Sequence, residues 1–358
     1  MCRAMSWWRN ILMMIMLALV PAIAGADIAH GSDEDKVDVA GLVFGHIGDS
    51  YGWHITKWKG HHVTIPLPCI VHSSTGWHVF MSSELEHGGI HEGLYLSEEN
   101  KIMELMPDGS SSRPFDISIT KNVASLIFSA LLLIFIVLWT ARWYRRHDAV
   151  KEGAPKGFRG LMELLVMMVT DDLIRPSVGE KHYRKYAPYL LTVFFFIFLS
   201  NLLGIVPFFP GGANVTGNIA VTMVLALFTF FMVNLFANRH YWKEILWPEA
   251  PIFLKFPLPI MQIIEIFGMI SKPFSLMVRL FANILAGHAM ILGLVAVIFV
   301  TAKLGPVING SMTLITMVFG VFMDCLELLV AFIQAYVFTM LSSVFIGMSR
   351  PEEEHPAA

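Results

Sequence analysis

Long apolar runs are the feature that most constrains how this chain can fold. Five stretches are long enough to cross the hydrocarbon core of a bilayer, which takes about 20 helical residues. They cover residues 122–143, 187–208, 217–237, 257–302 and 308–348. Runs of this length are typical of transmembrane helices rather than of the helices of a soluble core. We therefore expect an all-α polytopic membrane protein with about five transmembrane helices within residues 121–350.

Composition agrees with a bilayer environment. Of the 358 residues, 55% are hydrophobic and 15% are charged, and the formal net charge is −3; a soluble domain carries about 25% charged residues. A nearly neutral chain lacks the basic surface that nucleic-acid binding needs, so no nucleic-acid partner is expected. Cys2, Cys69 and Cys325 form no CxxC motif, which gives no sign of a zinc or redox site.

The first 26 residues have the order of a secretory signal peptide. Two arginines precede the apolar stretch from Ile11 to Val20, and small residues follow as far as Ala26. This order predicts export of the next segment and cleavage near Ala26. The alternative is an uncleaved anchor.

Residues 27–120 differ from the rest of the chain. They hold nine of the fourteen histidines and alternating stretches such as Trp53–Trp58 and Trp77–Phe80, a pattern typical of strands. Gly-Trp-His triplets at Gly52 and Gly76 hint at a repeated hairpin, and Ile65–Pro68, with its two prolines, is expected at a sheet edge or in a loop. We expect a small exported, β-rich domain.

Histidines in this region raise the question of a metal site, since imidazole is a common zinc ligand. The candidates are His61, His62, His87 and His91. Their spacing follows no ligand motif, and no predicted helix places His87 and His91 on one face. We therefore expect solvated strand histidines and no metal site.

Lysine and arginine predict the orientation, because short cytoplasmic loops collect these residues. The loop after the first span is rich in them, residues 209–217 contain none, and the loop after the third span again holds several. Residues 27–120 are therefore predicted to lie outside the cell and residues 351–358 in the cytoplasm. Within the first loop, Leu161–Leu173 combines apolar and acidic residues, which suits a helix in the membrane interface.

Polar side chains within the last two spans are the main functional signal, because an ionisable group in a membrane span costs about 2.5 to 3.5 kcal/mol. The fourth span contains Glu265, Lys272, Arg279, Asn283 and His288, and the fifth contains Asp324, Glu327 and Gln334. Lys272 and Glu265 can snorkel to the interface. Arg279 cannot, because long apolar runs lie on both sides of it.

Position numbers predict which of these side chains meet. In an antiparallel hairpin, the position numbers of two residues at equal depth always add up to the same value. Arg279 with Gln334 and His288 with Glu327 give nearly the same sum, and its midpoint falls in Gly305–Gly310, which has turn chemistry. We therefore expect Arg279 beside Gln334 and His288 beside Glu327, about 13.5 Å further toward the outside. Arg279 and His288 fall on roughly opposite helix faces.

Titration behaviour separates the expected roles of these groups. Histidine titrates near neutrality and can exchange a proton with an adjacent carboxylate, whereas arginine stays charged. We expect a relay of His288 and Glu327 that leads to an electrostatic barrier at Arg279. The alternative is a buried polar network that only ties the helices together.

The last two runs are longer than a bilayer requires. A helix of more than 35 residues exceeds about 50 Å, whereas the hydrocarbon core is about 30 Å thick. The hairpin must therefore tilt strongly or break, and Pro273 is the candidate position for a bend or break.

The segment Ser271–His288, SKPFSLMVRLFANILAGH, resembles the signature of subunit a of F-type ATP synthases. The resemblance extends to Asn201–Pro207, Glu265 and Gln334, and covers about residues 120–350. It implies a stator helix pair packed against a rotating ring of c subunits, with two half-channels open to opposite sides. It further implies the lipid bilayer and the b or b′ peripheral-stalk subunits as partners. The segment before residue 120 resembles the amino-terminal extension of some bacterial members.

The resemblance also implies roles for single residues. Arg279 matches the family's essential arginine, which attracts the deprotonated ring carboxylate and blocks leakage between the half-channels. Residues that match positions lining or shaping the proton path are Asn283, His288, Glu327 and Gln334, with Glu265 toward the cytoplasmic side and Asn218 and Ser275 as candidates in the access path. Some members carry the acid on the first helix and the histidine on the second, so the pair is exchanged here. The family often has an aspartate where Gly217 stands, and that part of the path differs.

The resemblance implies a multi-pass subunit of the cell inner membrane that translocates ions, catalyses no chemistry itself and needs no cofactor. The ion is expected to be the proton rather than sodium, because a histidine–glutamate pair suits proton exchange and is a poor sodium cage. Two other classes stay open. One is a secondary transporter or ion channel, although we find no internal repeat, and the other is a membrane-anchored metal-binding protein.

Overall fold

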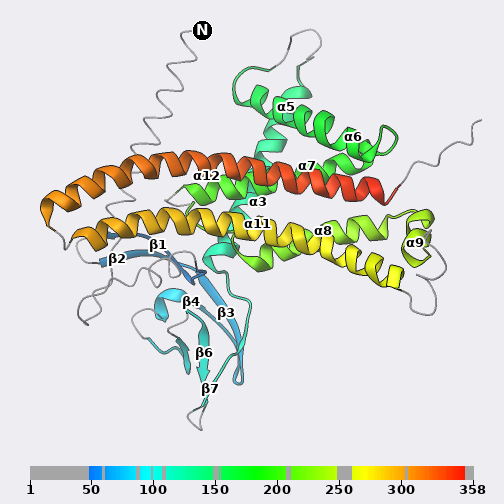
Figure 1. Cartoon of the computed structure of the whole chain (residues 1–358). Coiled ribbons are helices and arrows are strands. Elements are labelled where there is room, and N and C mark those ends of the chain that lie inside the picture. The colour runs from blue at the N-terminus through cyan, green and yellow to red at the C-terminus, as the bar shows by residue number, and fades with distance from the viewer. Residues whose placement is uncertain are drawn as a thin grey trace, which may run out of the picture. The chain divides into compact units, whose positions relative to one another are not determined.

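A computed structural model describes residues 48–58, 61–85, 89–97, 100–106, 110–147, 153, 155–206, 211–247, 260–302 and 305–350. Within them, a strand-rich part comes first along the chain and helices follow (Figure 1). Contacts divide the chain into two compact units, one of residues 1–128, 202–215 and 286–328, and the other of residues 129–201, 216–285 and 329–358. The predicted signal peptide and carboxyl tail lie outside the described residues.

Three small antiparallel sheets make up the strand-rich part. One joins β1 (Gly52–Trp58) to β2 (His61–Pro66). In the second, β3 (Pro68–Ser73) lies between β4 (Gly76–Met81) and β8 (Phe115–Asp116), and in the third β6 (Ile102–Leu105) lies between β5 (Leu94–Leu96) and β7 (Ser111–Ser112). A short helix, η1 (Ser82–Glu84), follows β4. The strands predicted at Trp53–Trp58 and Trp77–Phe80 are confirmed.

Alternation along the strands buries one sheet face in a small core. Cys69 and Val71 of β3 meet Phe80 of β4 there, together with Leu94 and Ile102. The triplets Gly52–His54 and Gly76–His78 do not mark a repeated hairpin, because the first opens the leading strand of β1–β2 and the second opens the returning strand of β3–β4. Pro66 ends β2, an edge strand as expected, whereas Pro68 begins β3, the central strand of its sheet.

Hydrogen bonds tie this β-rich part to the start of α3 (Lys121–Tyr144). The Lys121 N–H donates to the Ser50 carbonyl at 2.8 Å, and the Asn122 N–H donates to Asp49 Oδ1 at 3.1 Å. Just before the helix, the Ile117 N–H still pairs with β3 at 2.9 Å. The first apolar helix, α3, therefore follows the β-rich part directly, and hydrogen bonds hold its first residues to that part.

Four described helices are long and apolar enough to cross a membrane: α3, α7 (Tyr183–Ile205), α11 (Ile260–Thr301) and α12 (Pro306–Met348). The helix α8 (Ile219–Leu235) becomes a fifth only together with α9 (Arg239–Leu246), from which it is bent by 101°. The polytopic membrane fold is thus confirmed, and the third predicted span is the short, bent one.

Both long helices are continuous. They contain 42 and 43 residues, about 63 Å at 1.5 Å per residue. Pro273 lies inside α11 and does not end it, so the break considered from the sequence is wrong. A continuous helix of this length fits a hydrocarbon core of about 30 Å only when it tilts strongly.

The turn between these helices comes earlier than predicted. α11 ends at Thr301 and α12 begins at Pro306, so Asn309 and Gly310 already belong to α12. Proline has a fixed φ and no N–H, which suits it to the first helical position. Gly305 has φ +104°, a left-handed value that favours glycine.

The first loop after α3 is also helical. It contains α5 (Phe158–Met168), a π-helical turn, η3 (Val169–Ile174), and α6 (Arg175–Val178). These helices confirm helical structure over Leu161–Leu173, whereas its place in the membrane interface stays a prediction. A large apolar core in the same unit packs α5 to α9, α11 and α12 around Tyr186, Leu190, Phe194, Leu280, Phe338 and Ile346.

Candidate functional site

His288 and Glu327 form a hydrogen-bonded ion pair between α11 and α12. The imidazole Nδ1 meets Glu327 Oε1, and the two side chains are 17% and 6% exposed. This is the contact expected from equal depth in the hairpin. An imidazole and a carboxylate joined this way can pass a proton between them, because either group can hold the proton of their hydrogen bond.

Two glycines make room for this pair. A Cβ added at Gly287 would lie 3.3 Å from Glu327 Oε1, and one added at Gly204, in α7, would lie 3.6 Å from His288 Nε2. A side chain at either position would reduce the space around the pair, most tightly at Gly287. The pair is therefore closely surrounded by helix backbone.

Gln334 has a different partner from the one predicted. Asn283 Nδ2 donates to Gln334 Oε1 at 2.8 Å, whereas Arg279, one turn earlier on α11, has no hydrogen bond or ion pair to another described residue. The hydrogen-bonded partner of Gln334 on α11 is therefore Asn283, and the placement of Arg279 beside Gln334 stays a prediction. Equal depth alone could not find this, because helical side chains lean toward the amino terminus of their own helix and the two helices run in opposite directions.

Arg279 lies on the open face of α11. Its side chain is exposed, as are Ser275 and Asn283, while Leu276 and Leu280 between them are buried. The rest of the open face is apolar, with Phe267, Ile270, Phe274 and Val278 among its exposed side chains. Among the exposed described side chains of α11, only Arg279 carries a charge.

The remaining predicted residues lie apart from these pairs. Glu265 is half-buried in the first turns of α11, and Ser275 lies one turn before Arg279 on the same open face. Asn218 is half-buried and caps α8, because its side chain accepts the Ala220 N–H at 2.9 Å. Asn218 therefore has a structural role as an N-cap. Its position just before an apolar run could have indicated this role.

Sequence reasoning missed a polar cluster around Asn201. Asn201 is 3% exposed, donates to the Ala331 carbonyl at 3.3 Å and accepts a hydrogen bond from Thr216. It thereby joins α7 to α12 and to the segment before α8. The signal was available, since an asparagine within an apolar span needs an internal partner.

A recess lies nearer the cytoplasmic end predicted for α11. Its walls include Asn234, Tyr241, Lys272 and Pro273. The Lys272 ammonium lies 5.7 Å from the centre of the Phe345 ring. The lysine is half-buried against an aromatic ring.

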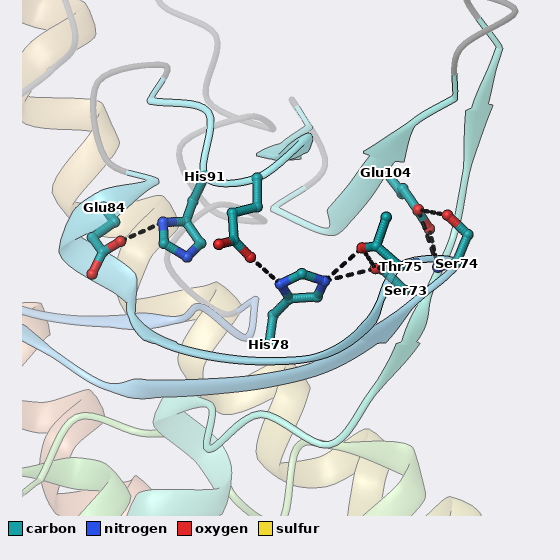
Figure 2. A network of polar contacts seen from close by, with 8 residues as sticks. Ser73, Ser74, Thr75, His78, Glu84, His91 and Glu104 are labelled. Carbon is teal, nitrogen blue, oxygen red and sulfur yellow. Dashed lines mark hydrogen bonds and ion pairs between the residues drawn. The ribbon is translucent and has the colours of Figure 1, made fainter.

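The histidines of the β-rich part form a separate network (Figure 2). His78 Nδ1 pairs with Glu92, and His78 Nε2 lies 2.9 Å from Ser73 Oγ and 2.8 Å from Thr75 Oγ1. His91 pairs with Glu84 at 2.5 Å. Among the described residues, no group of three or more histidine, cysteine, aspartate or glutamate side chains could hold a metal ion. His87 lies outside those residues, as do the side chains of His61 and His62.

Comparison with known proteins covers both parts of the chain. The family model described as ATP synthase A chain matches residues 124–347, and a domain of unknown function (DUF8433) matches residues 42–121. ATP synthase subunit a of Chloroherpeton thalassium is 39% identical over 248 residues, 67% of this chain and 69% of the relative.

Two further relatives give the same result. ATP synthase subunit a 2 of Chlorobaculum tepidum is 40% identical over 258 residues, 70% of each chain. ATP synthase subunit a of Anaeromyxobacter dehalogenans is 38% identical over 282 residues, 75% of this chain and 68% of the relative. Nothing among these relatives favours a secondary transporter or channel. The chain therefore belongs to the ATP synthase A chain family, the proton-translocating subunit a of the membrane sector of the synthase.

Proposed function

We propose that the open face of α11 around Arg279 works against a ring of c subunits, and that two half-channels meet there from opposite sides of the membrane. The observation that carries this proposal is Arg279 itself. It is exposed, it lies near the middle of a long apolar helix, and it has no ion pair among the described residues.

An unpaired arginine on such a surface needs a partner within the membrane. A lipid-facing charge in a span costs about 2.5 to 3.5 kcal/mol, and Arg279 is too far from either helix end to reach water. A carboxylate presented by a neighbouring subunit would remove this cost. A ring that brings one carboxylate after another past Arg279 would hold each one in its charged form while it faces the arginine.

In this proposal, the His288–Glu327 pair supplies the proton to the ring carboxylate. It is mostly buried and titratable, so it can take protons from the outer half-channel and deliver them toward the ring. The hydrogen bond from Asn283 to Gln334 fixes the two helices next to Arg279 without adding charge. Glu265 is proposed to serve the cytoplasmic half-channel, and Ser275 and Asn218 to line the access path.

The carried ion is proposed to be the proton rather than sodium. One imidazole and one carboxylate provide few oxygen ligands, whereas hard cations are bound by several oxygens. The subunit is proposed to move ions without chemistry or cofactor of its own. The b or b′ subunits of the peripheral stalk are proposed as its static partners.

Proton pumping by inverted membrane vesicles tests the proposal. Vesicles with the whole complex are supplied with ATP, and acidification is compared between the native chain, Arg279→Ala and the loop control Arg145→Ala. We expect Arg279→Ala to abolish acidification at matched assembly and Arg145→Ala to leave it unchanged. Acidification near the native rate in Arg279→Ala would contradict the proposal.

We further propose that the subunit lies in the cell inner membrane, with the β-rich part outside and the carboxyl end in the cytoplasm. The charge-poor loop and the basic loops support this orientation. Single cysteines at Thr75, in an exposed turn, and at Glu244, on α9, test it in a chain without native cysteines. A membrane-impermeant maleimide should label the first in intact cells and the second only in inverted vesicles. The reverse labelling would overturn the orientation.

A further inference from the structure

We propose that Asp324 is a further proton-carrying residue of this chain, one helical turn outside the His288–Glu327 pair on the outer half-channel. The inference rests on the proposed function, because it assigns a step that precedes the pair. Asp324 is three residues before Glu327 on α12. At that spacing the Cβ atoms are about 5 to 6 Å apart on one helix face.

The surroundings of Asp324 favour titration over a structural role. The residue is half-buried and within electrostatic range of Glu327, but no hydrogen bond or ion pair to another described residue holds its carboxyl group. A carboxylate that anchors helices would have such a partner, because an unpaired buried charge is destabilising. An intramembrane acid without a structural partner is first of all a candidate for carrying protons.

Polar and small residues continue from Asp324 toward the turn. On the face of α12 that carries Glu327 and Asp324, the residues at three- or four-residue spacing are Gly320, Thr316, Thr313 and Asn309. Thr316 is 7% exposed, and Asn309 Oδ1 accepts from Thr301 of α11 at 3.2 Å. The opposite face is apolar and exposed, with Leu314, Val318 and Phe322. The helix thus has one polar face that leads from the turn to the pair.

The turn is the end of the hairpin at which the outer half-channel would open. The compact unit that contains residues 286–328 also contains the β-rich part and the start of α3. If the β-rich part lies outside, as proposed, then a proton from outside reaches the polar face of α12 near Asn309 and meets Asp324 before Glu327.

The proposed step is a proton transfer between two carboxyl groups, and both groups return to their starting state. Asp324 binds a proton from water and passes it to Glu327 or, through Glu327, to His288; the next proton from water restores Asp324. Two carboxylates this close repel each other when both are charged, so a proton shared between them lowers the energy of the pair. The titratable groups that meet Asp324 are Glu327 on its own helix and, through Glu327, His288 on α11.

Proton-driven ATP synthesis by the reconstituted whole complex tests the assignment. The pH on the side of the β-rich part is varied between about 5.5 and 8 at constant total driving force, and Asp324→Asn is compared with Asp324→Glu and with Asp172→Asn, an exposed loop carboxylate. We expect Asp324→Asn to lose about tenfold in rate at the high-pH end, where protons are scarce, and less than twofold at the low-pH end. Asp324→Glu and the loop control should keep the native pH profile.

A native pH profile in Asp324→Asn would overturn the assignment. If Asp324→Asn does not assemble, Asp324→Thr is the second neutral variant, and the same profile decides. Glu327→Gln, measured in parallel, separates this failure from failure of the proposed function. If Glu327→Gln loses ATP synthesis while Asp324→Asn behaves like the native chain, only the role of Asp324 is wrong. If both variants behave like the native chain, the proposed proton path through Glu327 is wrong as well.

Discussion

Two of the histidine–glutamate pairs of this chain lie in very different surroundings. In the membrane helices, His288 and Glu327 are 17% and 6% exposed, and in the β-rich part, His78 and Glu92 are 10% and 61% exposed. Both pairs have the same chemical groups in direct contact. Only the carboxylate of Glu92 has free access to water, so water can replace His78 as the partner of Glu92.

Their other partners differ as well. His78 has Ser73 and Thr75 at its second nitrogen, which satisfies the imidazole completely and fixes a hairpin turn of the β-rich part (Figure 2). His288 has the backbone of Gly204 near its second nitrogen, and among the described residues no side chain forms a hydrogen bond or ion pair with that nitrogen. A pair whose groups are all hydrogen-bonded and whose carboxylate faces water stabilises a turn, whereas a buried pair with a free imidazole nitrogen is suited to proton transfer.

The largest difference is expected when each pair loses one member. Glu327→Gln or His288→Ala should lower ATP-driven proton pumping by about 100-fold, the lower range for a positioned proton-transfer group. His78→Ala should change pumping by less than about twofold, because water reaches its partners. Acidification of inverted vesicles at matched assembly measures both. Equal losses for the two histidines would show that the β-rich pair also lies on the proton path.

Exchanging the histidine and the glutamate tests whether the composition of the buried pair is enough for proton transfer. Each single replacement, His288→Glu or Glu327→His, puts two like groups together and should lose most of the pumping. The double replacement restores one imidazole and one carboxylate in contact, so we expect it to recover about a tenth or more of the native rate, a positive coupling between neighbours. Pumping in the double variant no better than in the single variants would mean that the orientation of the pair matters, not only its composition.

Crowding of the buried pair should have a smaller effect. Gly287→Ala places a methyl group 3.3 Å from Glu327 Oε1, whereas an added Cβ at Gly293, farther along α11, meets nothing within 4 Å. Overpacking typically costs about 1 to 3 kcal/mol, and a share of that cost should appear as an approximately fivefold loss of pumping in Gly287→Ala. Gly293→Ala is the matched control and should pump at the native rate. A normal rate in both variants would show that Glu327 has room to move.

The parts of the fold and of the site that the sequence predicted are those that depend on the length of apolar runs and on the spacing of residues along a helix. Apolar runs longer than a bilayer requires predicted the spans, and equal depth predicted the contact of His288 with Glu327. The same argument did not predict the hydrogen bond between Asn283 and Gln334, because it ignores how side chains lean along their helices. The open face of Arg279 also needed the structure, since the sequence cannot tell a lipid-facing from a buried side of an all-apolar helix.

Long-range contacts were beyond the sequence for a different reason. Asn201 bonds to the backbone of Ala331, and β3 pairs with β8 more than forty residues later. Neither contact has a local pattern, because each depends on how distant segments pack. The alternation of β1 and β4 could be recognised in the sequence, whereas the pairing order of the three sheets could not.

The smallest predicted effect concerns the stability of the β-rich part, where Cys69 is fully buried. Burial raises the pKa of this thiol from 9.0 to about 11. Between these values the unfolded chain releases a proton that the folded chain keeps, so stability is complete below pH 9 and falls as the pH rises toward 11. The loss is on the order of 1 kcal/mol at pH 10. Burial also raises the pKa of Tyr51, which continues the trend at higher pH.

Pulse proteolysis of the purified complex in urea, at pH values from 8 to 10.5, measures this loss through cleavage within residues 48–120. The native chain should unfold at lower urea as the pH rises above 9, and Cys69→Ala should show a shallower pH dependence, whatever its absolute stability. Cys325→Ala, which changes an exposed cysteine of α12, should follow the native chain. An unchanged slope in Cys69→Ala would mean that other groups titrate on unfolding. A parallel loss of pumping with the same midpoint would show that unfolding of the β-rich part is coupled to the proton path.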